Sequence, residues 1–174
     1  CSRHQETFYP VPAGQGGRVD DIAVSEQDPR IIYVGFATGG LWKSVNNGTT
    51  FQPLFDTFPV SSVGDVTLAP SNHDIVYVGT GEANNRQSSS FGAGLYKSTD
   101  GGSTWALLHN GSADVTLCDT VAEATAGGSP CSLRGVRRVA LDPGNPGIVY
   151  AGSYGRGIWR SPDGGTTWTQ IKAS

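Results

Sequence analysis

An eight-residue motif occurs three times in this chain of 174 residues. Its copies are Ser44-Val-Asn-Asn-Gly-Thr-Thr-Phe51, Ser98-Thr-Asp-Gly-Gly-Ser-Thr-Trp105 and Ser161-Pro-Asp-Gly-Gly-Thr-Thr-Trp168, and each closes a longer stretch of repeated sequence. Repeats spaced by tens of residues indicate similar supersecondary units packed side by side, not one irregular core. The motif therefore sets the register in which the rest of the chain is interpreted.

Three strand patterns precede or enter each copy of the motif. The first strands, with apolar residues at near-alternating positions, are residues 18–24, 63–68 and 136–141. The second strands are β-branched or aromatic throughout, as expected of strands covered on both faces; they are residues 31–35, 75–79 and 148–152. The third strands alternate apolar and basic residues over 40–44, 94–98 and 157–161, and fourth strands begin at Thr50, Thr104 and Thr167.

Four antiparallel strands per repeat, separated by turns rich in Asp, Asn, Pro and Gly, predict an all-β fold made of β-propeller blades. We expect one partial propeller over residues 1–174. Its parts are an N-terminal extension (1–15), blade 1 (16–54), blade 2 (61–108), an inserted loop (109–133) and blade 3 (134–172). No segment requires a helix.

The motif itself has a structural interpretation. The oxygens of its third residue are expected to accept hydrogen bonds from the turn backbone, and its last residue is expected to pack against the blade. These residues are Asn46, Asp100 and Asp163, and Phe51, Trp105 and Trp168. Asn47 stands where the other copies have glycine and tolerates a left-handed backbone. The basic residues of the third strands, Lys43, Lys97 and Arg160, are predicted to form solvated blade edges.

The motif Ser-x-Asp-x-Gly-x-Thr-Trp is the Asp-box, or BNR repeat. The three copies resemble the Asp-boxes found in sialidases, sortilin-like receptors, xyloglucanase-type glycoside hydrolases and many secreted bacterial propellers. The chain resembles the N-terminal part of a long sortilin-like or glycosyl-hydrolase-like propeller over residues 16–172, including Gly39–Ser44 and Tyr77–Asn84. The resemblance implies the fold; Asp-boxes lie at blade turns in families with different functions, so it implies no single activity.

Three blades are fewer than the typical four to eight or so of a closed propeller. Further blades of a longer parent chain, a homo-oligomer or another subunit must then cover the end blades, and we favour the first. A net charge of −3 and a pI near 5.5 argue against nucleic acid as a partner. No stretch has the length of a transmembrane segment.

The cysteines predict an extracellular, periplasmic or cell-envelope location. Cys118 and Cys131 enclose a short polar segment and are predicted to form a disulfide, which requires an oxidising compartment. Cys1 is compatible with a lipid anchor, although a fragment numbered from its first residue would look the same. His4, His73 and His109 are isolated, so we expect no metal and no cofactor.

Two insertions are predicted to lie on the same face of the propeller: residues 81–92 and residues 109–133. Elaborated loops on a regular scaffold commonly carry binding residues. The candidates for binding a glycan or a protein are Glu82, Asn84, Asn85, Arg86, Tyr154 and Arg156. The competing interpretation is that Glu82 and Asn84 only organise their own loop.

Catalytic residues are harder to choose. Glycosidases need two carboxyl groups about 5 to 9.5 Å apart; Glu82 and Asp119 are candidates, with Asp20, Asp114 and Glu123 nearby, but no spacing identifies a pair. In xyloglucanase-type enzymes a catalytic Asp precedes a Gly-Gly pair in the first blade, and the corresponding stretch here, 36–40, has no carboxylate. Sialidases use three clustered arginines, and strand alternation is expected to point Arg137 and Arg138 to opposite faces.

The sequence thus favours a secreted or envelope propeller segment that binds or scaffolds, with its recognition surface on residues 81–92 and 109–133. The first alternative is part of a carbohydrate-active enzyme, a glycoside hydrolase. The second is an accessory subunit that assists assembly of a larger complex.

Overall fold

The computed structural model describes residues 17–58, 60–82, 92–108, 135–153 and 157–173. These residues form three four-stranded antiparallel sheets, each in the strand order first, second, third, fourth. The predicted all-β fold of propeller blades is confirmed.

The strands follow the three sequence repeats. Blade 1 contains β1 (Val19–Val24), β2 (Ile32–Phe36), β3 (Gly40–Ser44) and β4 (Gln52–Pro53). Blade 2 contains β5 (Val63–Ala69), β6 (Asn72–Thr80), β7 (Leu95–Ser98) and β8 (Ala106–Leu108). Blade 3 contains β9 (Val136–Leu141), β10 (Val149–Ser153), β11 (Gly157–Ser161) and β12 (Thr169–Lys172). The fourth strands begin two residues after the expected threonines, because those threonines belong to the Asp-box turns.

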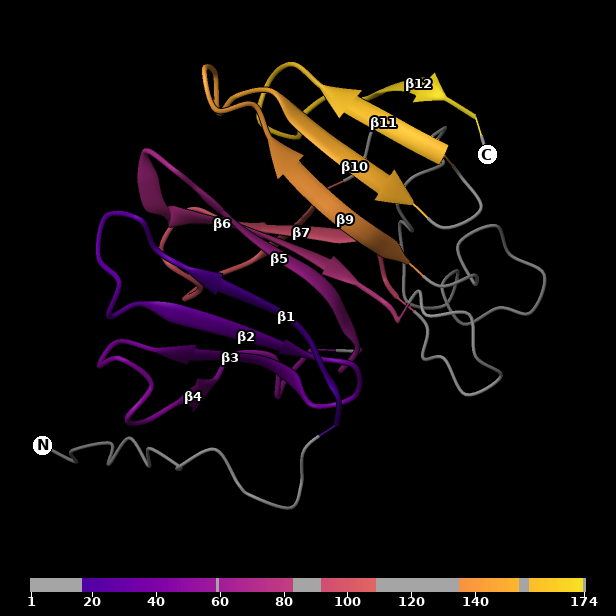
Figure 1. The fold of residues 1–174 in the computed structure, drawn as a ribbon. Helices are drawn as coiled ribbons and strands as arrows, with labels where there is room; N and C mark the ends of the chain where they lie inside the picture. The colour runs from indigo at the N-terminus through magenta and orange to yellow at the C-terminus, as the bar shows by residue number, and fades with distance from the viewer. Residues whose placement is uncertain (1–16, 59, 83–91, 109–134, 154–156, 174) are drawn as a thin grey trace, which may run out of the picture.

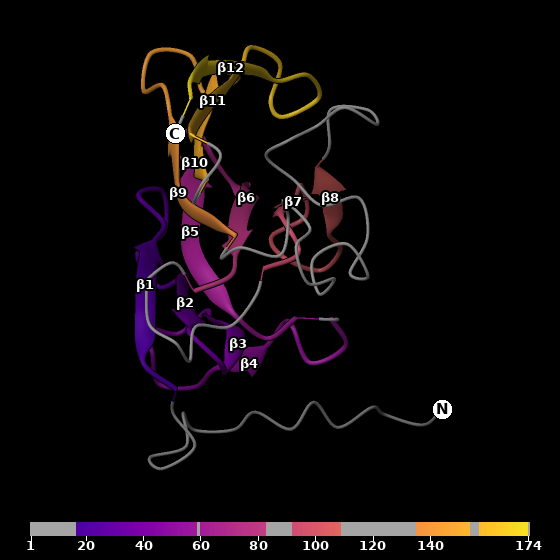
Figure 2. The same cartoon turned by 90° about the vertical axis from the view of Figure 1, so that its right-hand side faces the viewer.

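The first strands of the blades lie side by side, with β5 between β1 and β9 (Figure 1). Seen from the side, the second, third and fourth strands of each blade fan away from this shared inner edge (Figure 2). This is the arrangement of adjacent blades around part of a propeller axis.

The hydrophobic core lies between the blades. Tyr33 and Leu41 of blade 1, both fully buried, pack in one cluster with Val63 and Val66 of blade 2. A second cluster repeats this contact one blade further on, joining Tyr77, Leu95, Val136 and Val139. Each contact between successive blades is called a joint below.

Each joint also has a polar contact at the Asp-box. The Tyr33 hydroxyl and Lys43 Nζ both donate to the carbonyl oxygen of Gly101, over 2.9 and 2.6 Å. Tyr77 and Lys97 do the same to Gly164 O, over 3.1 and 2.8 Å. The prediction that Lys43 and Lys97 form solvated edges is therefore wrong, because the Asp-box of the following blade covers them.

A β-bulge near the start of each first strand shapes the inner part of the joints. The bulged residue pairs are Asp20 with Asp21, Gly64 with Asp65, and Arg137 with Arg138. Asp21 Oδ2 accepts a hydrogen bond from Val66 N, and Asp65 Oδ2 accepts one from Val139 N, over 2.9 and 3.0 Å. The bulge interrupts the regular alternation expected for Arg137 and Arg138, and both are exposed.

The Asp-box turns are held by local hydrogen bonds. Asp100 Oδ1 accepts from Thr104 N and from Ser98 Oγ, each over 2.8 Å. Asn46 and Asp163 make the equivalent contacts in their own turns. Phe51 and Trp168 are buried and Trp105 is partly buried, so the closing aromatic rings pack against the structure.

Candidate functional site

A polar cluster of three charged residues joins the start of blade 1 to the end of β6. Arg18 Nε donates to Asp20 Oδ1 over 2.8 Å, and Arg18 Nη2 donates to Glu82 Oε1. Hydrogen bonds to Asp20 and then to Glu82 raise the pKa of Arg18 above its usual value. One guanidinium therefore holds two carboxylates, and the three residues are called the Arg18 cluster below.

Backbone contacts place this cluster on the face of the propeller where second strands turn into third strands. Ala37 N donates to Arg18 O over 2.8 Å, and Gly81 N donates to Ser62 O over 2.9 Å. The cluster thus lies beside residues 36–40, the segment in which the family resemblance places a catalytic Asp. Ala37 in that segment is buried. The carboxylates of Asp20, in β1, and of Glu82, just after β6, both bind the side chain of Arg18, whose backbone carbonyl pairs with Ala37.

Exposure within the cluster is uneven. The side chains of Asp20 and Glu82 are 7% and 6% exposed, whereas that of Arg18 is 41% exposed. The Arg18 side chain is therefore partly accessible to solvent, while two buried carboxylates fix the position of its guanidinium. Such a group offers directed N–H donors to ring or hydroxyl oxygens of a sugar, or to a peptide carbonyl.

A second acidic group lies deeper, within the joint between blades 2 and 3. Burial raises the pKa of Asp65 to about 6, against the opposing effects of its hydrogen bonds to Val139 N and Thr67 Oγ1. Arg138 Nη1 lies 3.3 Å from Asp65 Oδ1. Because Asp65 accepts a hydrogen bond from the backbone of Val139, its carboxylate joins blades 2 and 3.

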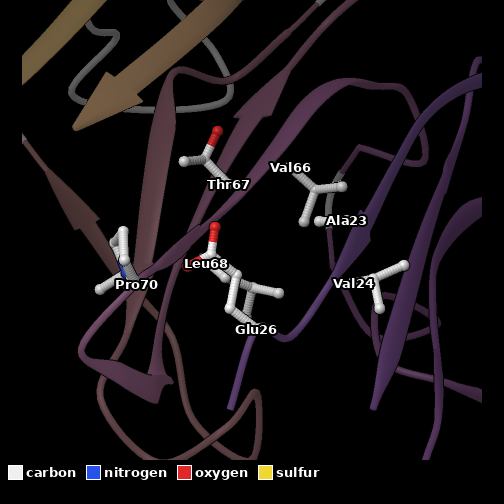
Figure 3. Close-up of a pocket in the computed structure, with 8 residues that line it drawn as sticks. Ala23, Val24, Glu26, Val66, Thr67, Leu68 and Pro70 are labelled. Carbon is white, nitrogen blue, oxygen red and sulfur yellow. The ribbon is translucent and has the colours of Figure 1, made fainter. Parts of the chain in front are cut away.

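A small groove opens between blades 1 and 2 at the opposite ends of the first strands (Figure 3). Its volume is about 180 Å³, and its walls are Ala23, Val24, Glu26, Val66, Thr67, Leu68, Ala69 and Pro70. These walls are mainly aliphatic, with one carboxylate from the turn after β1. The groove is separated from the Arg18 cluster by the length of the strands.

Of the predicted site residues, Glu82 and Asp20 fall within the described part of the chain and meet through Arg18. Asn84, Asn85, Arg86, Asp119, Tyr154, Arg156, Cys1, Cys118 and Cys131 lie outside the described residues. Sequence reasoning did not predict Arg18 as the partner of Glu82, because its position 64 residues earlier carries no local signal.

In the part of the chain that the structure describes, the His, Cys, Asp and Glu side chains include no group of three arranged to hold a metal ion. No helix in this part of the chain has the length and apolar character needed to cross a membrane.

Comparison with curated proteins finds xyloglucanases. A xyloglucanase of Acetivibrio thermocellus is 28% identical over 169 residues, covering 94% of this chain and 18% of that protein. A Paenibacillus xyloglucanase is 28% identical over 167 residues, and one from Hypocrea jecorina is 27% identical over 169; each match covers 92% of this chain. The chain spans less than a fifth of these relatives' lengths. No protein-family profile matches.

Solved structures give the same architecture. A GH74 enzyme of Niastella koreensis matches with a TM-score of 0.62 and 26% identity, covering 88% of this chain and 22% of that one. An ancestral GH74 enzyme matches with a TM-score of 0.68 and 23% identity, over 90% and 18% of the two chains. YCF48 from Cyanidioschyzon merolae matches with a TM-score of 0.58 and 17% identity, over 96% and 44%. The last two likenesses concern the fold alone.

Proposed function

We propose that this chain is a segment of a carbohydrate-active propeller similar to the xyloglucanases, and that the Arg18 cluster forms part of the wall that contacts the polysaccharide. The observation that carries this proposal is the partly exposed Arg18 guanidinium held by two buried carboxylates. It lies on the face where the sequence predicts the elaborated loops. The xyloglucanase relatives, which match across nearly the whole chain, support a glycan as the ligand class.

The proposal follows the carbohydrate-active alternative in preference to a general binding or scaffolding role. It assigns this segment to substrate binding and not to bond cleavage. The carboxylates of Asp20 and Glu82 are bound to the same guanidinium, whereas glycoside hydrolysis requires an acid and a second carboxylate on opposite sides of the scissile bond. Further blades of a longer protein would supply such a pair.

The test measures binding of xyloglucan oligosaccharides to the chain by titration calorimetry. Glu82→Gln keeps the size of the side chain but removes the charge that fixes Arg18, and we expect an affinity loss of about tenfold, since losing one charge-assisted hydrogen bond costs about 1.4 kcal/mol or more. Asp56→Asn is the matched control, because Asp56 is an exposed carboxylate in the link between blades 1 and 2. It should bind like the unaltered chain.

Two results would contradict the proposal. One is unchanged binding by a Glu82→Gln variant that melts at the same temperature as the unaltered protein. The other is hydrolysis of the oligosaccharides by the chain alone that Glu82→Gln abolishes, since this would make Glu82 a catalytic residue.

A further inference from the structure

A polar pocket opens at the joint between blades 1 and 2, and it is called the joint pocket below. Its volume is about 370 Å³, and it is lined by Lys43, Gln52, Pro53 and Leu54 of blade 1 and by residues 101–103 of the Asp-box of blade 2. Strand β3 runs from its first residue, on the face of the Arg18 cluster, to its last residues beside this pocket. The joint pocket and the Arg18 cluster therefore lie at opposite ends of the strands.

Lys43 presents hydrogen-bond donors to the joint pocket from a fixed position. Its ammonium group has three N–H donors, and Gly101 O accepts one of them over 2.6 Å. Lys43 Nζ also lies 5.4 Å from the centroid of the Tyr33 ring. Within the described residues no second acceptor binds this ammonium, so its other donors are available to a ligand.

Gln52 and Ser103 extend the polar rim, one from each blade. Both residues are exposed, and Gln52 lies opposite Lys43 in the pairing of β3 with β4. The side-chain amide of Gln52 makes no hydrogen bond within the described part of the chain. Ser103 Oγ donates to Asp100 O over 3.1 Å, and its oxygen can still accept. A hydroxyl group in the joint pocket would thus find both donors and acceptors.

Pro53 and Leu54 give the joint pocket an apolar wall. Both are partly buried, and Leu54 packs against the hydrophobic cluster between blades 1 and 2. A Cβ added at Gly102 would lie 2.8 Å from Leu54 Cδ1, so the wall is in close contact with the Asp-box turn. An apolar wall combined with a few directed polar groups is a common design of sites for small ligands.

The charges around the joint pocket indicate the class of ligand. Burial lowers the pKa of Lys43, and the nearby charges of Asp74 and Asp100 raise it. A Cβ added at Gly101 would lie 3.1 Å from Lys43 Nζ and 3.3 Å from Asp74 Oδ1, so these two charges lie close together. Two carboxylates beside one ammonium leave no positive excess to attract an anion. A neutral molecule with several hydroxyl groups fits this setting better.

The joint between blades 2 and 3 offers a comparison within the same chain. Its lysine also donates to an Asp-box glycine, and its fourth-strand leucine also contacts the following glycine. In blade 2, however, Ala106 lies opposite Lys97, whereas in blade 1 Gln52 lies opposite Lys43. The framework is common to both joints, and the carboxamide belongs to the first.

We propose that the joint pocket binds a neutral saccharide, separately from the Arg18 cluster. The Gln52 amide donates to one hydroxyl of the sugar and accepts from its neighbour, and Lys43 donates to another. Pro53 and Leu54 contact the C–H groups on one face of the pyranose ring. Because few groups of the protein take part, we expect weak, rapidly reversible binding that adds a second point of attachment for a glycan.

A two-dimensional ¹H–¹⁵N NMR titration of the chain with a xyloglucan oligosaccharide tests this proposal. We expect saturable shifts of the backbone amides of Gly102 and Ser103 and of the Gln52 side-chain amide. Gln52→Ala should weaken the affinity reported by the two backbone amides about fivefold, as expected for one neutral hydrogen bond. An oligogalacturonate, which carries negative charges, should shift these signals less. The shifts should persist in Glu82→Gln, because the Arg18 cluster is a separate site.

Thr169→Ala is the matched control for Gln52→Ala. Thr169 is the exposed counterpart of Gln52 in blade 3, opposite Arg160, and its variant should titrate like the unaltered chain. The proposal would be overturned by absent shifts at Gly102 and Ser103, by loss of these shifts in Glu82→Gln, or by an equal response to the oligogalacturonate. Unchanged affinity in a Gln52→Ala variant that melts like the unaltered chain would also overturn it. The calorimetric effect of Glu82→Gln concerns the Arg18 cluster alone, so either site can fail without the other.

Discussion

The carboxylates of the Asp-boxes and the carboxylate of Asp65 stabilise the same blades in opposite electrostatic settings. Asp100 and Asp163 lie at the surface, yet hydrogen bonds from Thr104 and Thr167 lower the pKa of each to about 2. Asp65 is 1% exposed, and burial raises its pKa to about 6. The Asp-box carboxylates are stabilised in their charged form, whereas Asp65 is held in a place that disfavours its charge.

The partners of these carboxylates explain the difference. Asp100 bonds to Ser98 and Thr104, which belong to the same turn. Asp65 bonds to Val139, which is 74 residues away in the next blade. The surface carboxylates therefore shape one blade, while the buried one joins two.

Removing the buried carboxylate should have the largest effect. In Asp65→Ala, the buried N–H of Val139 loses its acceptor, and we expect the free energy of unfolding to fall by about 3 kcal/mol. Chemical denaturation at pH 5 measures this loss, with Asp56→Ala as the surface control. A loss below about 0.5 kcal/mol would show that the joint does not depend on this hydrogen bond.

The pH dependence of stability should be the next largest effect. Since the pKa of Asp65 is raised from 3.8 to about 6, its contribution is fully present below about pH 4 and is lost as the pH rises through 6. We expect this group to lower the free energy of unfolding by about 2 kcal/mol between pH 4 and pH 7. Asp65→Asn should remove that decline.

The surface carboxylates should give the opposite dependence. The pKa of Asp100 and Asp163 is lowered, so their contribution is present above about pH 4 and is lost as the pH falls towards 2. Denaturation curves across this range would separate the two groups. A stability that rises steadily from pH 4 to pH 7 and is unaffected by Asp65→Asn would contradict the assignment.

Ser98→Ala tests the hydrogen bonds within a single Asp-box turn. The Ser98 hydroxyl is buried, donates to Asp100 Oδ1 and accepts from Gly102 N, each over 2.8 Å. We expect a loss of about 1.5 kcal/mol, because Gly102 N remains buried without this acceptor. Ser103→Ala, at an exposed position of the same turn, is the control and should change stability by less than about 0.5 kcal/mol.

Tyr77→Phe should have the smallest effect. It removes one of the two donors to Gly164 O while Lys97 remains, so about 1 kcal/mol is expected. Tyr150→Phe is the matched change on the outer face of blade 3, where the described residues offer its hydroxyl no such carbonyl. Thermal unfolding should be unchanged by Tyr150→Phe; equal losses in the two variants would show that the hydrogen bond from Tyr77 to Gly164 O does not stabilise the joint.

Structure that depends on contacts between residues close in sequence could be predicted, whereas structure that depends on contacts between blades could not. The Asp-box turns and the strands were predictable because their hydrogen bonds and periodicity lie within a few neighbouring residues. The roles of Lys43 and Lys97 were not, because the carbonyls that bind them belong to the following blade. The inner bulges were missed for a related reason: Asp20 and Asp21 look like ordinary positions of an alternating strand.

The same distinction between local and distant contacts applies to the Arg18 cluster. Glu82 was predicted from its position in a long loop, but its partner Arg18 lies in another blade and has no motif of its own. Charged pairs between distant segments leave no periodic trace in a single sequence. The ion pair between Glu82 and Arg18 could therefore be found only in the folded chain.

The joints connect blade 1 to blade 2 and blade 2 to blade 3, so each blade is stabilised by its immediate neighbours. In an array of this kind the free energy of local opening depends on how many neighbours a unit has. Backbone amides of β6 should accordingly exchange with deuterium most slowly, and those of β2 and β10 faster, although the three strands have nearly the same sequence. The exchange rate of a blade's amides would then report how many neighbouring blades pack against it.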